Sequence, residues 1–92
     1  MLSVIWLDDA LADIQQIVAF IAQSNPRAAQ ALADKLIDDA DMLAVLPAHY
    51  RRGRVAGTHE FVSHPNYTIV YRRTLSAIEI LNIVHSRQQY PN

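Results

Sequence analysis

The stretch that decides the fold is HEFVSHPNYTIVYRRTLSAIEILNIVH, residues 59–85. Apolar and polar side chains alternate along most of it, and a period of two is typical of β-strands. Two groups of turn-forming residues interrupt the alternation, Pro65-Asn66 and Thr74-Leu75-Ser76. The sequence therefore predicts three consecutive antiparallel strands, at residues 59–64, 67–73 and 77–85.

A strand and a helix are predicted at the other end of the chain. Residues 3–7, SVIWL, are β-branched and aromatic, as expected of a short buried strand. Asp8 or Asp9 can then cap a helix that ends near Ser24. Its apolar residues recur at the three- and four-residue spacing of an amphipathic helix, and they are Leu11, Ile14, Ile17, Val18 and Ile21.

Asn25-Pro26 predicts an immediate restart of helical structure, with Asn as the N-cap and Pro at the first helical position. This second helix runs to about Leu46, and residues 47–53 form a polar connector to the strands. Because so few residues separate the helices, they form an antiparallel hairpin. The chain is thus expected to be one α+β domain, residues 1–92, of order β-α-α-β-β-β, with the helices packed on one face of the sheet.

Composition narrows the classes of function. The 92 residues include no cysteine, so neither disulfides nor thiolate metal sites are expected. The four histidines lack the spacing of a ligand pair, and we expect no metal or other cofactor. There is no run of about 18 apolar residues and no secretory signal, which favours a cytoplasmic protein without a membrane partner.

Charge is distributed unevenly along the chain. The net charge is −1, but residues 1–46 carry two cations and seven carboxylates, a balance of −5. Residues 47–92 carry six arginines and two glutamates, a balance of +4, together with all four histidines. The second half could therefore hold an acidic partner or a short length of phosphate backbone. The alternative is a soluble surface whose charge is merely uneven.

Alternation along the strands sorts their side chains between the two faces of the sheet. A two-residue turn at Pro65-Asn66 would pair His64 with Tyr67, Val62 with Ile69, and Glu60 with Tyr71, while Arg72 would face Glu79. On that register, a uniformly apolar face meets the helices and the opposite face stays uncovered. The uncovered face would have an apolar centre of Phe61, Val70, Leu81 and Ile83 and a rim of His59, Arg72, Glu79, His85 and Arg87.

Three fragments carry a family resemblance: NPRAA at 25–29, RVAGTHEFVSHPNYTIVYR at 54–72 and IEILNIVHSRQQYP at 78–91. In this order after a helical hairpin, they resemble the RelE/ParE superfamily of bacterial toxins, across essentially the whole chain. The resemblance implies the β-α-α-β-β-β fold. It also implies a toxin of a type II toxin–antitoxin module, which a cognate antitoxin binds and neutralises.

The resemblance leaves two targets open. ParE-like members are associated with inhibition of DNA gyrase, whereas RelE-like members resemble ribosome-dependent endoribonucleases that cut messenger RNA. The chain has a single lysine and a pI near 6.4, which is modest for a protein that approaches a polyanion. This low positive charge favours the ParE-like branch and gyrase. The segments at 1–14, 54–67 and 84–91 also look closer to ParE-like members.

Under the RelE-like alternative, the resemblance assigns catalytic positions to Arg72, His85 and Tyr90, with Arg54 as a further phosphate contact. Cleavage of RNA without a metal needs a base, a cation on the phosphate and an acid, and these residue types can supply them. Each also has a purely structural explanation. Arg72 can pair with Glu79, His85 can be a solvated strand end, and Tyr90 can anchor the C-terminus.

Both branches share the antitoxin as a partner in a toxin–antitoxin hetero-oligomer. The antitoxin is expected to lay an amphipathic helix followed by an extended segment on the uncovered sheet face and in the grooves beside the helical hairpin, and the extended segment could add to an exposed sheet edge. The residues predicted to bind the antitoxin or the target are Phe61, Val70, Arg72, Leu81, Ile83, His85 and Arg87.

Overall fold

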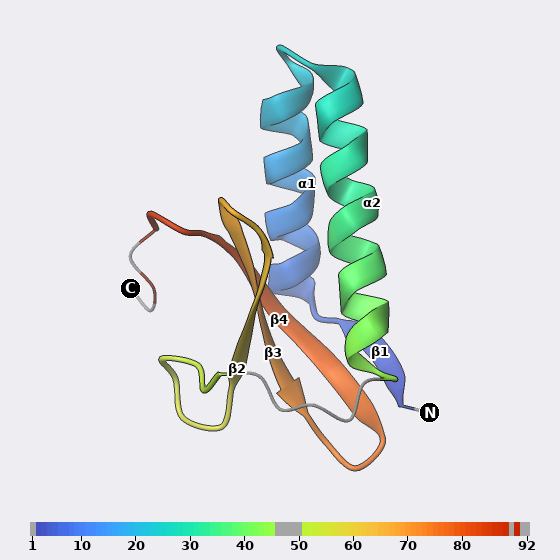
Figure 1. The fold of residues 1–92 in the computed structure, drawn as a ribbon, viewed down its shortest axis with the longest axis vertical. Coiled ribbons are helices and arrows are strands. Elements are labelled where there is room, and N and C mark those ends of the chain that lie inside the picture. The colour runs from blue at the N-terminus through green and yellow to red at the C-terminus, as the bar shows by residue number, and fades with distance from the viewer. Residues whose placement is uncertain (1, 46–50, 89, 91–92) are drawn as a thin grey trace.

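The computed structural model describes residues 2–45, 51–88 and 90. Its elements are β1 (Ser3–Trp6), α1 (Asp8–Ala22), α2 (Pro26–Leu43), β2 (His59–His64), β3 (Tyr67–Arg73) and β4 (Ala77–His85). This is the predicted order of one strand, two helices and three strands. The last three strands form an antiparallel meander, and β1 adds to it in parallel with β4, which gives the strand order β1-β4-β3-β2 (Figure 1).

The two helices form the expected hairpin, and the predicted cap is confirmed for the second. Asn25 is the N-cap of α2, where its Oδ1 accepts a hydrogen bond from the Ala28 N–H at 3.1 Å. The N-cap of α1 is Leu7, so the predicted aspartate cap is wrong. Asp8 and Asp9 lie in the first turn instead, where the helix dipole favours negative charge. Neither helix, within the described residues, is long and apolar enough to cross a membrane.

The helices pack on one face of the sheet, and the core lies between the two layers (Figure 1). The buried side of α2 is an apolar stripe at helical spacing, formed by Ala29, Leu32, Leu36, Ala40 and Leu43. The sheet residues in the same core cluster are Ile69, Tyr71, Ile78, Ile80 and Ile83. Periodic apolar residues on both layers therefore account for the α+β architecture.

The strand register is only partly as predicted. The pairs His64–Tyr67 and Arg72–Glu79 form, whereas the predicted pairs Val62–Ile69 and Glu60–Tyr71 do not. The cause is a bulge in β2 between Val62 and His64, which adds an extra residue to that strand. Phe61 consequently lies opposite Ile69.

The register changes the face on which two predicted binding residues lie. Phe61 packs against the core under the helices, and Ile83 is part of that core. For Ile83 the reason is a second irregularity, which leaves Leu81 outside the paired register and reverses the alternation after it. The prediction that Phe61 and Ile83 line an uncovered face is therefore wrong.

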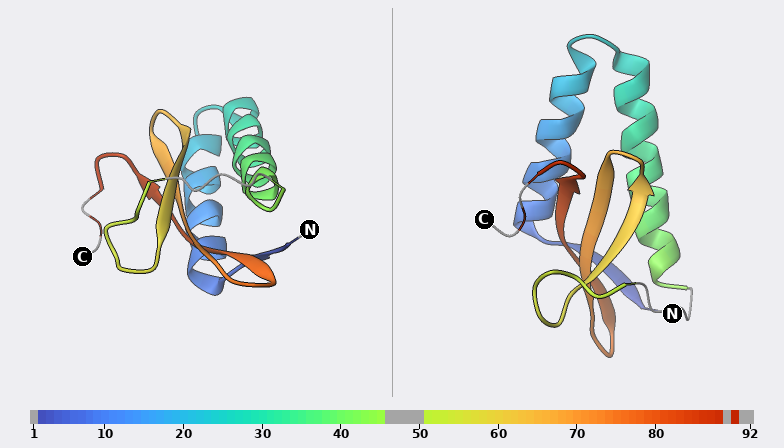
Figure 2. Two further views of the ribbon diagram at one scale, coloured as in Figure 1. Left: turned by 60° about the horizontal axis from the view of Figure 1, so that its bottom comes forward. Right: turned by 60° about the vertical axis from the view of Figure 1, so that its left-hand side comes forward.

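The face of the sheet away from the helices is not open either. Its central residues are almost inaccessible to solvent, and they are Glu60, Thr68, Val70 and Val84. Residues 51–58 lie on this side of the sheet (Figure 2), where Arg51 and Arg54 contact Glu60. Only marginal residues such as Val62 and Arg72 are exposed here. The predicted apolar docking face is thus largely filled by the chain itself.

Candidate functional site

The segment before β2 converges on Glu60, a carboxylate that is only 3% exposed. Arg51 Nη2 lies 3.2 Å from Glu60 Oε1. Arg54 approaches Oε2 twice, through its backbone N–H at 3.1 Å and through Nε at 3.4 Å. A buried charge is costly unless it is paired, so these contacts fix residues 51–58 against the sheet.

Residues 51–58 form a loop with internal hydrogen bonds of their own. The Gly53 N–H donates to the Thr58 carbonyl at 2.8 Å, and the Thr58 hydroxyl donates to the Val55 carbonyl at 2.6 Å. Gly57 has φ of 81°, in the left-handed region that favours glycine. The loop therefore presents Arg54 in a defined orientation.

Arg54 joins this loop to the C-terminal tail. Its Nη1 donates to the backbone oxygen of Tyr90 at 3.0 Å, and the guanidinium carbon lies 5.9 Å from the centre of the Tyr90 ring. Burial and then the nearby Glu60 carboxylate raise the pKa of the Tyr90 phenol above its ordinary value of 10.0, against a smaller opposite effect of Arg54. The phenol is therefore protonated at neutral pH, so it can donate a proton but cannot act as a base.

Arg72 pairs with Glu79 across two strands, which is the structural explanation that the sequence had left open for it. Its Nη2 and Nε lie 2.6 Å and 2.8 Å from Glu79 Oε1. Both side chains are partly exposed, so the pair contributes less than about 1 kcal/mol to stability. A phosphate group could occupy Arg72 only in competition with Glu79.

His85 lies on the helix side of β4, which corrects its predicted place on the opposite rim. Its ring meets Tyr67 edge-on, with 5.2 Å between the centroids. Its Nδ1 accepts a hydrogen bond from the Arg87 N–H at 3.0 Å, which leaves Nε2 for any ligand. The residue lines a cavity of about 330 Å³ whose other walls include Asp13 and Phe20 of α1.

The candidate catalytic groups do not converge on one point. Arg72 lies opposite Glu79 near the start of β4, and His85 ends the same strand six residues later. At about 3.3 Å per residue, the backbone positions that carry these two side chains are about 20 Å apart. The structure thus brings Arg54 and Tyr90 together and holds Arg72 apart from His85. No three His, Asp or Glu side chains among the described residues are placed to hold a metal ion.

Residues 4–90 match the family described as the ParE toxin of the type II toxin-antitoxin system, parDE. The chain belongs to the ParE toxin family. It is 39% identical over 88 residues to the toxin RelE2 of Caulobacter vibrioides, covering 94% of this chain and 97% of the relative. It is 34% identical over 86 residues to the protein Y4kP of Sinorhizobium fredii, covering 94% and 90%.

Solved structures share the fold of this ParE-family toxin. The chromosomal ParDE toxin–antitoxin system of P. aeruginosa matches with a TM-score of 0.83 at 20% identity, over 92% of this chain and 96% of the other. A YafQ variant of E. coli matches with a TM-score of 0.53 at 15% identity, over 94% of each chain. The predicted membership of the RelE/ParE superfamily and the predicted α+β fold are confirmed.

The residues predicted to bind a partner are scattered in this ParE-family toxin. Phe61, Ile83 and His85 lie on the helix side, and Val70 is fully buried. On the opposite side Leu81 is half-buried and Arg72 is exposed, while Arg87 is exposed in the tail. The predicted binding surface is therefore not one continuous patch.

Two structurally central carboxylates were not singled out by the sequence analysis, Glu60 and Asp13. Asp13 Oδ2 accepts hydrogen bonds from Asn82 Nδ2 at 3.1 Å and from the Ile83 N–H at 3.0 Å. These two residues lie past the part of β4 that pairs with β1, so Asp13 supplies the acceptor along that stretch of the β4 edge. For Glu60, a single glutamate in an apolar strand that follows several arginines could have indicated a buried carboxylate paired with those arginines. Asp13 offers no such signal, because Asn82 lies 69 residues further along the chain.

Proposed function

We propose that this ParE-family toxin arrests bacterial growth by binding DNA gyrase, without catalysing a reaction itself, and that a cognate antitoxin neutralises it in a hetero-oligomer. The family match over residues 4–90 supports the role of a toxin with an antitoxin partner. The separation of Arg72, which lies opposite Glu79 near the start of β4, from His85 at the end of β4 is the observation that favours binding over catalysis.

Cleavage of RNA requires a base, a cation and an acid around a single phosphate. Arg72 is engaged with Glu79, and Arg54 is engaged with Glu60 and with the tail. The Tyr90 phenol is protonated, as an acid must be, but its raised pKa makes it a weaker acid than an ordinary tyrosine. His85, the residue type best suited as a base, sits beside α1 on the other side of the sheet. This arrangement suits a rigid binding domain better than a nuclease.

The exposed arginines in the second half of the chain supply a means of binding. Arg52, Arg73 and Arg87 are exposed, and none of them forms an ion pair within the described part of the chain. The DNA that gyrase holds is a source of negative charge for such a surface. We expect electrostatic attraction to accelerate the encounter and to weaken as salt is raised.

The test is a supercoiling assay with purified gyrase, relaxed plasmid and toxin. The toxin should inhibit supercoiling or accumulate cleaved DNA, and premixed antitoxin should abolish the effect. The double variant Arg73→Gln/Arg87→Gln should inhibit more weakly than the matched variant Arg27→Gln/Lys35→Gln. The matched variant also loses two positive charges, but it loses them from helix α2. No effect of wild-type toxin, in an assay where a known gyrase poison acts, would overturn the proposal.

A ribosome-dependent mRNA interferase is the second candidate. It is favoured by the 39% identical relative that carries the name toxin RelE2, and by the contact between Arg54 and the tail residue Tyr90. Its test is cleavage of a defined message in a translation extract. Cleavage at ribosome-bound codons that disappears in Arg54→Ala and Tyr90→Phe would replace the gyrase proposal.

A further inference from the structure

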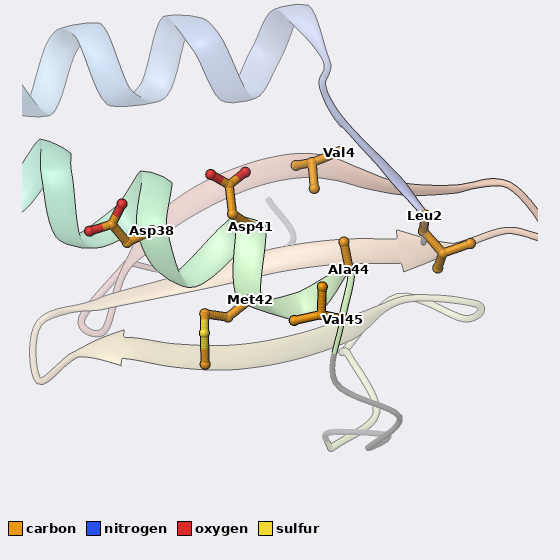
Figure 3. A pocket seen from close by; sticks show the side chains of 7 residues that line it. All are labelled: Leu2, Val4, Asp38, Asp41, Met42, Ala44 and Val45. Carbon is orange, nitrogen blue, oxygen red and sulfur yellow. The ribbon is translucent and has the colours of Figure 1, made fainter.

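The cavity between α1 and the end of β4 differs in its lining from a larger cavity elsewhere in the molecule. The larger one, of about 820 Å³, lies between β1 and the end of α2, and no aromatic ring is among the described residues that line it (Figure 3). The cavity at β4, of about 330 Å³, is lined by the rings of Phe20, Tyr67 and His85. Ligand cavities in proteins start at about 300 Å³, so this one can admit a small planar molecule.

The three rings offer stacking surface from both layers of the fold. Phe20 comes from α1 and is 72% exposed, although its side chain is wholly apolar. Tyr67 and His85 lie opposite each other on β3 and β4, and their rings meet edge-on with 5.2 Å between the centroids. Exposed aromatic rings are common stacking partners of unpaired nucleobases.

Polar groups at the cavity have unused hydrogen-bonding capacity. Asp13 is bonded only through Oδ2, so Oδ1 is a free acceptor within the described residues. Gln88 accepts the His85 N–H through Oε1 at 3.2 Å, which leaves its Nε2 as a donor. Because His85 Nδ1 accepts the Arg87 N–H, a neutral imidazole carries its proton on Nε2 and is a second donor. An acceptor near two donors complements the edge of a nucleobase, where donors and acceptors lie side by side.

The charges around the cavity favour a ligand with few phosphates. Arg87 is exposed and has no ion pair within the described residues, and its backbone N–H lies against the His85 ring. Its side chain can therefore neutralise a phosphate at the cavity mouth. The opposite wall is α1, which carries three aspartates and no basic residue. Such a wall repels a long polyanion but tolerates a single terminal phosphate.

We propose that this cavity binds a free purine nucleotide. The base lies between Phe20 and the rings of the sheet, and its edge bonds to Asp13 and Gln88. The phosphate lies at Arg87. A purine is preferred to a pyrimidine because its fused rings present more surface for stacking. This site goes beyond the proposed function and does not depend on it, because the toxin alone should bind the nucleotide.

NMR titration of full-length toxin tests the site, with adenosine monophosphate as the probe. The amide signals of Phe20, Ile83 and Gln88 should shift together. Adenosine monophosphate should bind at least about tenfold more tightly than ribose 5-phosphate, which carries the phosphate without a base. It should bind at least about threefold more tightly than uridine monophosphate. Equal affinity for adenosine monophosphate and ribose 5-phosphate, or unmoved signals at millimolar nucleotide, would overturn the proposal.

The variant Phe20→Ala tests the stacking contact. It should weaken binding of adenosine monophosphate about tenfold, because it removes the ring that α1 supplies. The matched variant Leu75→Ala also shortens an exposed apolar side chain, but in the turn between β3 and β4, and should bind like wild type. Both residues lie at the surface, so circular dichroism should show both variants folded. Equal affinity in the two variants would overturn the assigned position of the base.

The variant Gln88→Glu tests the edge contact. Glutamate keeps an oxygen for the His85 N–H but loses the amide donor, so binding of adenosine should weaken about fivefold. Adenosine is the probe because it has no phosphate for the new charge to repel. Gln15→Glu is the matched control, since Gln15 is exposed on α1 and lines a different cavity. An effect of the same size in both variants would overturn the assigned edge contact.

A short single strand of deoxyadenylates separates a free nucleotide from a nucleic-acid strand as the ligand. The strand should bind no more tightly than adenosine monophosphate, because the aspartates of α1 repel its additional phosphates. Affinity at least about tenfold higher for the strand, falling steeply as salt is raised, would overturn the proposal in favour of strand binding. A toxin that binds no nucleotide but still inhibits gyrase would overturn this site and leave the proposed function intact.

Discussion

Arg54 donates a hydrogen bond to the backbone oxygen of Tyr90, 36 residues further along the chain, while it also pairs with the buried carboxylate of Glu60. One guanidinium therefore ties the loop before β2 to the C-terminal tail. Because Glu60 also holds Arg51, the placement of both segments depends on a single carboxylate. The covered side of the sheet is built around this contact.

Replacement of Glu60 by Gln should lower the free energy of unfolding by about 1–3 kcal/mol, because an amide cannot neutralise the two guanidinium groups. The matched change Glu79→Gln breaks the exposed pair with Arg72 and should cost less than about 1 kcal/mol. Urea denaturation of both variants checks the difference. Equal losses would mean that burial of Glu60 has no energetic consequence.

Replacement of Asp13 by Ala should remove the cap on the β4 edge and cost about 1–3 kcal/mol, because the Ile83 N–H and the Asn82 amide lose their acceptor. The Ile83 amide should then exchange much faster with solvent, which NMR can follow. Asp9→Ala, a change in the first turn of the same helix, should leave that amide unaffected. Unchanged protection of Ile83 in the Asp13 variant would contradict the role given to this carboxylate.

The Tyr90 phenol should ionise at higher pH than a free tyrosine, because burial and the Glu60 carboxylate raise its pKa above 10.0. A raised folded pKa gives stability that is complete below the unfolded pKa and is lost as the pH rises through the folded pKa. Alkaline unfolding curves of wild type and Tyr90→Phe should therefore differ only above about pH 10. Curves that coincide over the whole alkaline range would show that Tyr90 is not perturbed.

Much of the fold follows from local patterns in the sequence. Two-residue alternation predicts the meander, and Asn25-Pro26 predicts the break between the helices together with the cap that the structure shows. The pairing of Arg72 with Glu79 is also as predicted, because it depends only on the short turn between β3 and β4. Features set by neighbouring residues are thus well predicted.

The face assignments were not predictable from alternation alone. A bulge before His64 adds a single residue and moves Phe61 to the helix side of the sheet. The position of Ile83 depends in the same way on an irregularity near Leu81. Val70 is buried beside Glu60, which holds Arg51 and Arg54 of a loop that has no periodic pattern, so the sequence predicted an open surface where the structure has a buried one.

The central claim is that this toxin acts by binding rather than by proton transfer, and growth arrest by the double variant His85→Gln/Tyr90→Phe tests it most directly. Glutamine can still accept the Arg87 N–H, and phenylalanine keeps the ring and the backbone oxygen that Arg54 contacts. The variant should arrest growth at an inducer level within about twofold of wild type. Loss of general acid–base chemistry would instead reduce activity by about 100-fold or more. A folded, antitoxin-binding double variant that no longer arrests growth would contradict the account.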